Sequence, residues 1–303
     1  MTTSTHAAIE ATGLSRTFGK TTALDGIDLS IPRSGITAIL GANGAGKTTF
    51  INCALGLLPK SGGHLSVFGG KPGSGANRQR TGVMLQDANL PDQLSAVEHL
   101  DLFASYYRQS LSVDEVVDLC ALSDFATKRY GSLSGGQKRR VQFALAVIGQ
   151  PDLIFLDEPT TGLDAEARRG LWATIDNLAG QGRSIVLTTH YLEEADALAD
   201  RILVFNKGRV IADGSPTEIR EAVGDALIKC VTTLDADAIS RMPAVRAARL
   251  SGRYTEIISL NAPKTLTTLL PADPAISDLT VSKPSLEDAF LDITKTPSAE
   301  AQS

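Results

Sequence analysis

The sequence has few cysteines, and they form no recognisable pattern. Its three cysteines, Cys53, Cys120 and Cys230, lie far apart in apolar surroundings. An odd number without the close spacing of metal-binding pairs argues against a disulfide framework and against a structural zinc site. We therefore expect all three thiols to be reduced and buried, and we expect no structural zinc.

Long apolar runs are also missing. The longest apolar stretches, such as Val141–Ile148, are far shorter than the roughly 18 residues that a membrane-spanning helix needs. The start of the chain, Met1–Ala8, is polar and lacks the basic and then apolar pattern of a secretory signal. These features predict a chain that does not cross a bilayer and that works in the cytoplasm.

An excess of basic charge is missing as well. The chain has 29 Lys and Arg residues against 34 Asp and Glu residues, which gives a net charge of -5. Binding to a nucleic-acid backbone needs concentrated basic charge, so we expect no nucleic-acid partner. The one dense basic cluster, Lys138–Arg140, is interpreted as a solvated or partner-facing helix surface.

A length of 303 residues predicts about two domains. Short β-rich runs alternate with helical patterns from Ile9 to Asp213, which is typical of an α/β fold. The expected strands are Ile9–Leu14, Gly26–Ile31, Ile36–Leu40, Thr81–Leu85, Leu153–Asp157, Ser184–Thr189 and Arg201–Asn206.

A second domain is expected to begin near Gly224, after a turn at residues 213–216 and a short helix over Thr217–Val223. Its residues read as strand, helix, strand, strand, helix and strand with a closing helix, Ser285–Ile293, which favours a small α+β, ferredoxin-like sandwich. The predicted domains are therefore residues 1–223, residues 224–293 and a flexible tail, residues 294–303.

Residues Gly41–Thr48 have the spacing of a phosphate-binding loop, Gly-x-x-x-x-Gly-Lys-Thr. An apolar run, Ile36–Leu40, precedes the loop and a helix-compatible stretch, Thr49–Leu57, follows it. Glycines allow successive backbone N–H groups to point at phosphate oxygens, while Lys47 adds positive charge and the Thr48 hydroxyl can bind Mg²⁺. A simple glycine-rich turn is the alternative, and the flanking pattern disfavours it.

Two adjacent carboxylates follow an apolar strand at Leu153–Glu158. Open α/β sheets bind ligands at the carboxyl ends of their strands, so Asp157 can hold Mg²⁺ and Glu158 can face an attacking water. Adjacent residues of a strand point in opposite directions, so these two roles require the chain to leave strand geometry after Asp157. Pro159 favours such a departure. The alternative is a solvated strand end.

A second anion-binding helix start is predicted at Ser134-Gly135-Gly136-Gln137, ahead of a helical run over Lys138–Ile148. One nucleotide has no evident use for two such sites in the same chain. A family resemblance accounts for the presence of both anion-binding sites.

The chain resembles the nucleotide-binding subunit of ATP-binding cassette (ABC) transporters over roughly Ile9–Asp213. The motifs occur in the order that the family has: Gly41–Thr48 resembles Walker A, Gln86 the Q-loop, Leu133–Gln137 the signature, Leu153–Glu158 Walker B, residues 160–164 the D-loop, and His190 the switch histidine. The resemblance implies a P-loop NTPase fold, in which a mixed sheet with a RecA-like core carries a helical signature subdomain.

The resemblance also implies ATP and Mg²⁺ as cofactors and assigns roles to residues. The implied catalytic residues are Glu158, His190, Gln86 and Lys47, and the implied Mg²⁺ ligands are Thr48, Gln86 and Asp157. Nucleotide contacts are implied for Phe18, Gly41, Asn43, Gly44, Ala45, Gly46, Lys47, Thr48, Thr49, Ser134, Gly135, Gly136, Gln137 and Asp164. For Phe18, stacking on adenine competes with a role as a hydrophobic anchor. The remaining histidines, His6, His64 and His99, are expected in loops or at the surface.

Two partners follow from the resemblance. A second copy pairs head to tail, so that the signature helix of one copy closes on the phosphate loop of the other. A separate membrane permease contacts Leu90–Leu94, which places the chain on the inner face of the cell membrane. The segment Lys283–Leu291 resembles the ending of daunorubicin-type exporter subunits, which favours a drug or small-molecule exporter.

Two other functions are compatible with a phosphate-binding loop. A non-transport ABC-type ATPase of translation or DNA repair generally carries two cassettes or long coiled coils, and neither pattern is present. A metabolic P-loop kinase leaves Ser134–Gln137 and His190 without a use. Export therefore remains the favoured function.

Overall fold

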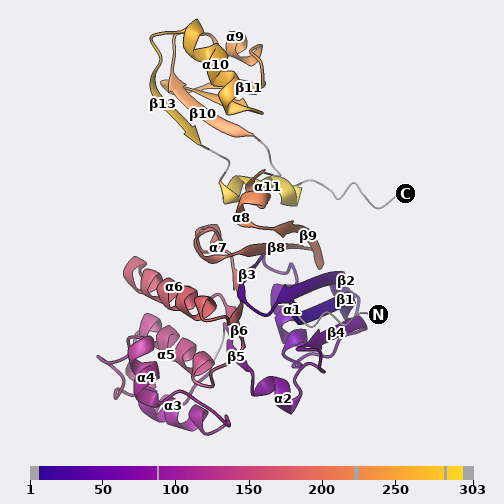
Figure 1. Ribbon diagram of the computed structural model, residues 1–303, viewed down its shortest axis with the longest axis vertical. Coiled ribbons are helices and arrows are strands. Elements are labelled where there is room, and N and C mark those ends of the chain that lie inside the picture. The colour runs from indigo at the N-terminus through magenta and orange to yellow at the C-terminus, as the bar shows by residue number, and fades with distance from the viewer. Residues whose placement is uncertain (1–6, 87–88, 222–224, 283–284, 296–303) are drawn as a thin grey trace. The chain divides into compact units, whose positions relative to one another are not determined.

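The computed structural model describes residues 7–86, 89–221, 225–282 and 285–295. The chain divides into two compact units, Met1–Asp213 and Gly214–Ser303 (Figure 1). No helix among the described residues is both long enough and apolar enough to span a membrane.

The first unit contains two sheets. Its strands are β1 (Ala7–Phe18), β2 (Thr21–Pro32), β3 (Gly35–Leu40), β4 (Gly62–Val67), β5 (Thr81–Met84), β6 (Leu153–Asp157), β7 (Ser184–Thr189), β8 (Arg201–Asn206) and β9 (Arg209–Gly214). An antiparallel sheet has the order β2-β1-β4. A larger sheet has the order β5-β6-β7-β3-β8-β9, and its neighbouring strands from β5 to β8 pair in parallel. Every residue of β6 and β7 is buried, as expected for strands covered on both faces.

All seven strands predicted for this unit are present, and two further strands were missed. β4 contains two glycines and has an exposed first half, and it is held by its pairing with β1, where Ile9 lies opposite Val67. β9 has no fully buried residue. Neither strand has the apolar pattern by which a strand is predicted. Each is stabilised instead by pairing with a neighbouring strand.

The helices of the first unit are α1 (Lys47–Ala54), α2 (Gly75–Arg78), α3 (Ala96–Ala104), α4 (Val113–Leu119), α5 (Gly135–Val147), α6 (Ala165–Gly180) and α7 (Leu192–Leu198). Three of them begin in the same way. A serine accepts a hydrogen bond from the third helical residue, whose own side chain accepts from the serine N–H; the pairs are Ser95 with Glu98, Ser112 with Glu115 and Ser134 with Gln137. These reciprocal bonds fix where each helix begins.

The prediction that His99 lies at the surface was wrong. His99 is fully buried on α3, with Nδ1 2.8 Å from the carbonyl oxygen of Ser95 and its ring packed against Tyr130 at 5.5 Å between centroids. His64 is exposed on β4 as expected, and His6 lies outside the described residues. The cysteine prediction was correct, since all three thiols are free and buried, and burial raises the pKa of Cys120 to about 12.

The second unit carries α8 (Pro216–Glu221), β10 (Ala226–Val231), α9 (Ala236–Ser240), β11 (Val245–Ser251), β12 (Tyr254–Ser259), α10 (Ala262–Ala272), β13 (Ser277–Ser282) and α11 (Leu286–Lys295). Its sheet is antiparallel with the order β11-β12-β10-β13, and the element order is the one expected from the sequence. Its core consists of Ile228, Cys230, Ile239, Ile257 and Leu269.

The two units divide earlier than the predicted boundary. The division falls after Asp213, and α8 packs against α11 within the second unit. The predicted boundary residue, Gly224, lies outside the described residues, as does the predicted tail from residue 296 onward. Helix α11 continues to Lys295, so the first two residues of the predicted tail are helical.

Asp273 ties β10 to the end of α10, and we predict that it makes the second unit sensitive to acid. Its carboxylate accepts hydrogen bonds from Thr232 Oγ1 at 2.6 Å and from the backbone N–H groups of Thr233 and Ala275. These bonds lower the pKa of Asp273 to about 2. An unfolded aspartate has a pKa of about 3.9, so the stabilisation is complete above that pH and is lost as the pH falls toward 2.

Asp273→Asn is therefore expected to destabilise the second unit at neutral pH, by an amount that shrinks as the pH falls below about 4. Hydrogen exchange of peptides from residues 225–282, compared between wild type and variant across this pH range, measures the difference. A difference that does not change with pH would contradict the assignment.

Candidate active site

The order of the larger sheet brings three strand ends together. β6, β7 and β3 are neighbours, and they run parallel, with Asp157 opposite Thr188 and Leu40 opposite Thr189. The residues that follow these strands therefore lie at one edge of the sheet, which is where parallel α/β sheets bind ligands. They are Gly41, Glu158 and His190, from segments far apart in the sequence.

The loop after β3 has space only for glycine at critical positions. A Cβ atom at Gly41 would lie 2.5 Å from the carbonyl oxygen of Phe205, and one at Gly46 would lie 2.6 Å from that of Ala23. Gly46 also has a φ of 109°, and it caps α1. The glycines thus bring the loop against its neighbours while turning it into the helix start.

Lys47 lies at the base of this loop and is only 7% exposed. Its Nζ atom donates hydrogen bonds to the carbonyl oxygens of Gly41, at 2.6 Å, and Ala42, at 3.3 Å. Burial lowers the pKa of Lys47, while the nearby carboxylates of Glu158 and Asp157 act in the opposite direction. The side chain places a positive charge where the loop curls.

Asp157 is the last residue of β6 and is 4% exposed. Burial raises the pKa of its carboxyl group, the hydrogen bond from Thr188 Oγ1 to Asp157 Oδ1 opposes this effect, and the charge of Glu158 adds to it. A buried carboxylate next to a second one requires positive charge nearby if both are to stay ionised.

The side chain of Glu158 points in a different direction from that of Asp157, because the chain leaves strand geometry at Glu158. Its φ is 51°, and its N–H donates to the carbonyl oxygen of Thr188 at 3.0 Å. The departure that the two carboxylates require is therefore present. A left-handed conformation at a non-glycine residue is uncommon and is held in place by its surroundings.

The carboxylate of Glu158 is held by two side chains. His190 Nδ1 lies 3.0 Å from Oε1, and Thr161 Oγ1 donates to Oε2 at 3.2 Å. The His190 ring in turn packs against Tyr191, with 4.1 Å between ring centroids. Both oxygens of the carboxylate thus have a partner that fixes its direction.

A pocket of about 800 Å³ unites most of the predicted site residues. It is lined by Phe18, residues 41–49, Gln86, Asp157, Glu158 and His190, together with Thr21, Thr22 and Ala23. The last three were not predicted from the sequence. The register of β1 and β2 places Thr21 opposite Phe18, so the short turn at Gly19-Lys20 was the signal that could have found them.

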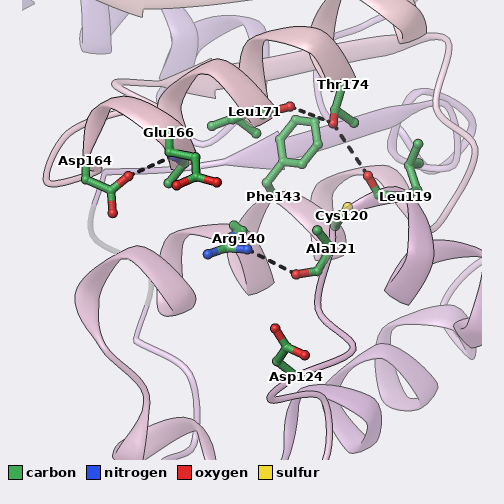
Figure 2. Close-up of a pocket in the computed structure, with 12 residues that line it drawn as sticks. Leu119, Cys120, Ala121, Asp124, Arg140, Phe143, Asp164, Glu166, Leu171 and Thr174 are labelled. Atoms are coloured by element: carbon green, nitrogen blue, oxygen red, sulfur yellow. Dashed lines mark hydrogen bonds between the residues drawn. The ribbon is translucent and has the colours of Figure 1, made fainter.

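The structure does not bring Ser134–Gln137 or Asp164 into this pocket. Ser134 caps α5, and Asp164 caps α6 by accepting a hydrogen bond from Ala167 N at 2.8 Å. Asp164 instead lines a separate pocket of about 440 Å³, together with residues of α4, α5 and α6 such as Arg140 and Phe143 (Figure 2). Within one chain, the signature residues and the phosphate loop belong to different surfaces.

Comparison with known proteins agrees with these observations. The model of the ABC transporter family matches residues 24–161. Daunorubicin resistance ATP-binding protein DrrA3 of Streptomyces coeruleorubidus is 35% identical, and the alignment covers 95% of this chain and 96% of that protein. Nod factor export ATP-binding protein I of Rhizobium sp. (strain N33) is 34% identical, with 95% and 97% covered. These relatives favour an export ATPase over a non-transport ATPase.

Solved structures show the same fold. An ATP-binding subunit of an ABC transporter is 28% identical, with a TM-score of 0.65 over 72% of this chain and 93% of that chain. A dimeric ATP-binding cassette in a post-hydrolysis state, bound to ADP and phosphate, is 25% identical, with a TM-score of 0.63 over 68% and 98% of the two chains.

ATP-binding cassettes hydrolyse ATP to drive transport, and this chain has their fold, their motifs in order and relatives that match it over nearly its whole length. The chain belongs to the ABC transporter family, as an ATP-binding and ATP-hydrolysing subunit.

Proposed function

We propose that this subunit powers the export of a drug or another small molecule through a separate membrane permease. The subunit would bind the permease at the inner face of the cell membrane. The observation that carries the catalytic part of the proposal is the Glu158–His190 pair beside the phosphate loop. The names of the relatives, which refer to daunorubicin resistance and Nod factor export, support the direction of transport.

In the proposed reaction, the loop amides and Lys47 bind the β- and γ-phosphates of ATP. Glu158 accepts a proton from water while the water oxygen bonds to the γ-phosphorus, and the bond from that phosphorus to the bridging oxygen of ADP breaks. Because His190 and Thr161 hold its two oxygens, Glu158 is aimed before the nucleotide arrives. His190 contacts the γ-phosphate and stabilises the developing charge.

The donor set fits Mg²⁺, which prefers oxygen ligands. Thr48, Gln86 and Asp157 all line the pocket and offer a hydroxyl, an amide and a carboxylate oxygen. Bound there, the cation would neutralise phosphate charge, and it would relieve the repulsion between Asp157 and Glu158 that the buried site otherwise carries.

We further propose that two copies pair head to tail. Gly135 begins α5 with open space around it, since a Cβ there would meet nothing within 4 Å. Gly136 lies against Leu163, the residue before Asp164: a Cβ atom added at Gly136 would lie 3.3 Å from Cδ2 of Leu163. The signature helix start and Asp164 therefore belong to one surface, which another copy's ATP-loaded pocket can approach.

The permease is proposed to contact residues 90–94. This segment is mostly exposed and is hydrogen-bonded to the residues that lead into the signature helix. Tyr130 N donates to Leu94 O at 2.8 Å, and Gly131 N donates to Asp92 O at 3.0 Å. A partner that moves residues 90–94 would thereby move Ser134 and its helix start.

Transport assays test this function directly. The permease that co-purifies with the full chain would be reconstituted with it in vesicles, and ATP-dependent movement of a fluorescent anthracycline would be measured. We expect transport that requires ATP and is lost in Glu158→Gln. Active ATP hydrolysis without movement of any offered small molecule would contradict export.

Removing residues 214–303 is expected to change the affinity for ATP by less than about threefold, because compact units with their own cores can fold separately. Every residue lining the pocket belongs to the first unit. Calorimetry of the truncated and full chains, with circular dichroism to show that both fold, measures the effect. Complete loss of binding by a folded truncation would show that the second unit contributes to the site.

A further inference from the structure

One face of the Phe18 ring is already occupied within the chain. Phe18 lines the pocket and is 44% exposed. The guanidinium carbon of Arg16 lies 4.5 Å from the centroid of the ring, in the geometry of a cation–π contact. An aromatic ring has two faces. Arg16 covers one face of Phe18, and the other face remains for a ligand.

The backbone sets up this contact. Arg16 and Phe18 are two residues apart on β1, so their side chains project from the same side of the strand. Pairing with β2 places Arg16 opposite Leu24 and Phe18 opposite Thr21, and the register shift between Arg16 and Thr17 skips Ala23 on β2. A stack built on paired strands is more rigid than one built on a loop, and rigid elements position binding groups more accurately.

Arg16 has an unusual setting for a charged side chain. Its Nε atom is buried and has no hydrogen-bond partner among the described residues. None of the ion pairs found between described residues includes Arg16. A buried donor without a partner costs free energy, so its presence beside the pocket calls for an explanation.

We propose that Arg16 is a positioning residue for the nucleotide base, which acts by holding the Phe18 ring in the orientation that stacks on adenine. The proposal rests on the proposed function and on the nucleotide contact that the family resemblance implies for Phe18. A ring that is fixed before binding loses less side-chain freedom when the base arrives, which strengthens binding. Because stacking contacts the face of the base and not its edges, Arg16 strengthens the binding of ATP and GTP alike and leaves phosphate binding unchanged.

Four variants of the full chain test the proposal: Arg16→Met, Arg16→Lys, Phe18→Ala and the double variant Arg16→Met with Phe18→Ala. Calorimetry measures the Kd of ATP, of GTP and of inorganic tripolyphosphate, which has the phosphates without the base. Arg16→Met is expected to raise the Kd of both nucleotides by about three- to fivefold, and KM to a similar extent, with kcat unchanged. Tripolyphosphate should bind as it does to the wild type.

Arg16→Lys keeps a cation over the ring and is expected to restore most of the affinity. In the Phe18→Ala background, Arg16→Met should have no additional effect, because the arginine acts only through the ring. Arg33→Met is a matched control, since Arg33 lies over a different ring, Phe68, at 5.7 Å, and neither residue lines the pocket. If Arg16→Met does not fold, Arg16→Gln removes the charge while keeping a planar polar group.

The outcomes separate the role of Arg16 from that of Phe18. If Phe18→Ala weakens nucleotide binding and Arg16→Met does not, the role of Arg16 is wrong while that of Phe18 stands. Equal weakening of ATP and tripolyphosphate by Arg16→Met, or additive effects in the double variant, would also overturn the role of Arg16. If Phe18→Ala leaves the Kd of ATP unchanged, the adenine contact itself is wrong.

Discussion

Glu158→Gln is expected to lower the rate of ATP hydrolysis by at least about 100-fold, because general-base catalysis contributes factors of this size and an amide cannot accept the proton. Glutamine has nearly the same shape as glutamate, and its amide oxygen can still accept the hydrogen bond that Thr161 donates to Glu158. The phosphate loop and Lys47 are unchanged, so ATP binding should persist.

The variant should then accumulate as a dimer with ATP, which size-exclusion chromatography with and without ATP detects. Glu193→Gln is the matched control, since that carboxylate is 77% exposed and pairs with Arg168 outside the pocket. It should hydrolyse ATP at the wild-type rate. A Glu158→Gln protein that hydrolyses ATP normally would remove the proposed base, and one that stays monomeric at saturating ATP would contradict the head-to-tail dimer.

Lys47→Ala is expected to weaken ATP binding by about 100-fold, since hydrogen bonds to charged groups contribute roughly 1.5–3 kcal/mol each and tenfold in affinity corresponds to about 1.4 kcal/mol. The substitution also removes the positive charge that acts on Asp157, so that the γ-phosphate would meet two carboxylates without a fixed counter-charge. Hydrolysis should fall below detection.

Equilibrium binding of ATP to the Lys47→Ala and wild-type chains measures this effect. Lys60→Ala serves as the control, because Lys60 is exposed and donates to the carbonyl oxygen of Gly63 away from the pocket. The affinity of the Lys60→Ala variant for ATP should match that of the wild type. ATPase activity of Lys47→Ala close to that of the wild type would show that the phosphate loop is not the nucleotide site.

The parts of the fold that were predictable have strong local patterns. β6 is apolar at every position before Asp157, and β7 has a central apolar run, Ile185–Leu187; both were predicted with their observed bounds. The element order of the second unit was also correct. β4 was missed because it begins with two glycines and its first half is exposed, and β9 was missed because none of its residues is fully buried. His99 was misplaced because its burial depends on Ser95 and on the Tyr130 ring, which is distant in sequence.

The sequence by itself determined the chemistry: a glycine loop that ends in Lys47 and Thr48, two acids after a buried strand, and a capped helix start at Ser134. These features depend on spacing and backbone preference, which act over a few residues. Only the tertiary structure decided which of them meet. The parallel order β6-β7-β3 places Glu158 and His190 beside the phosphate loop, whereas Ser134 and Asp164 cap helices outside that pocket, because strand pairing and helix packing join segments that no local rule connects.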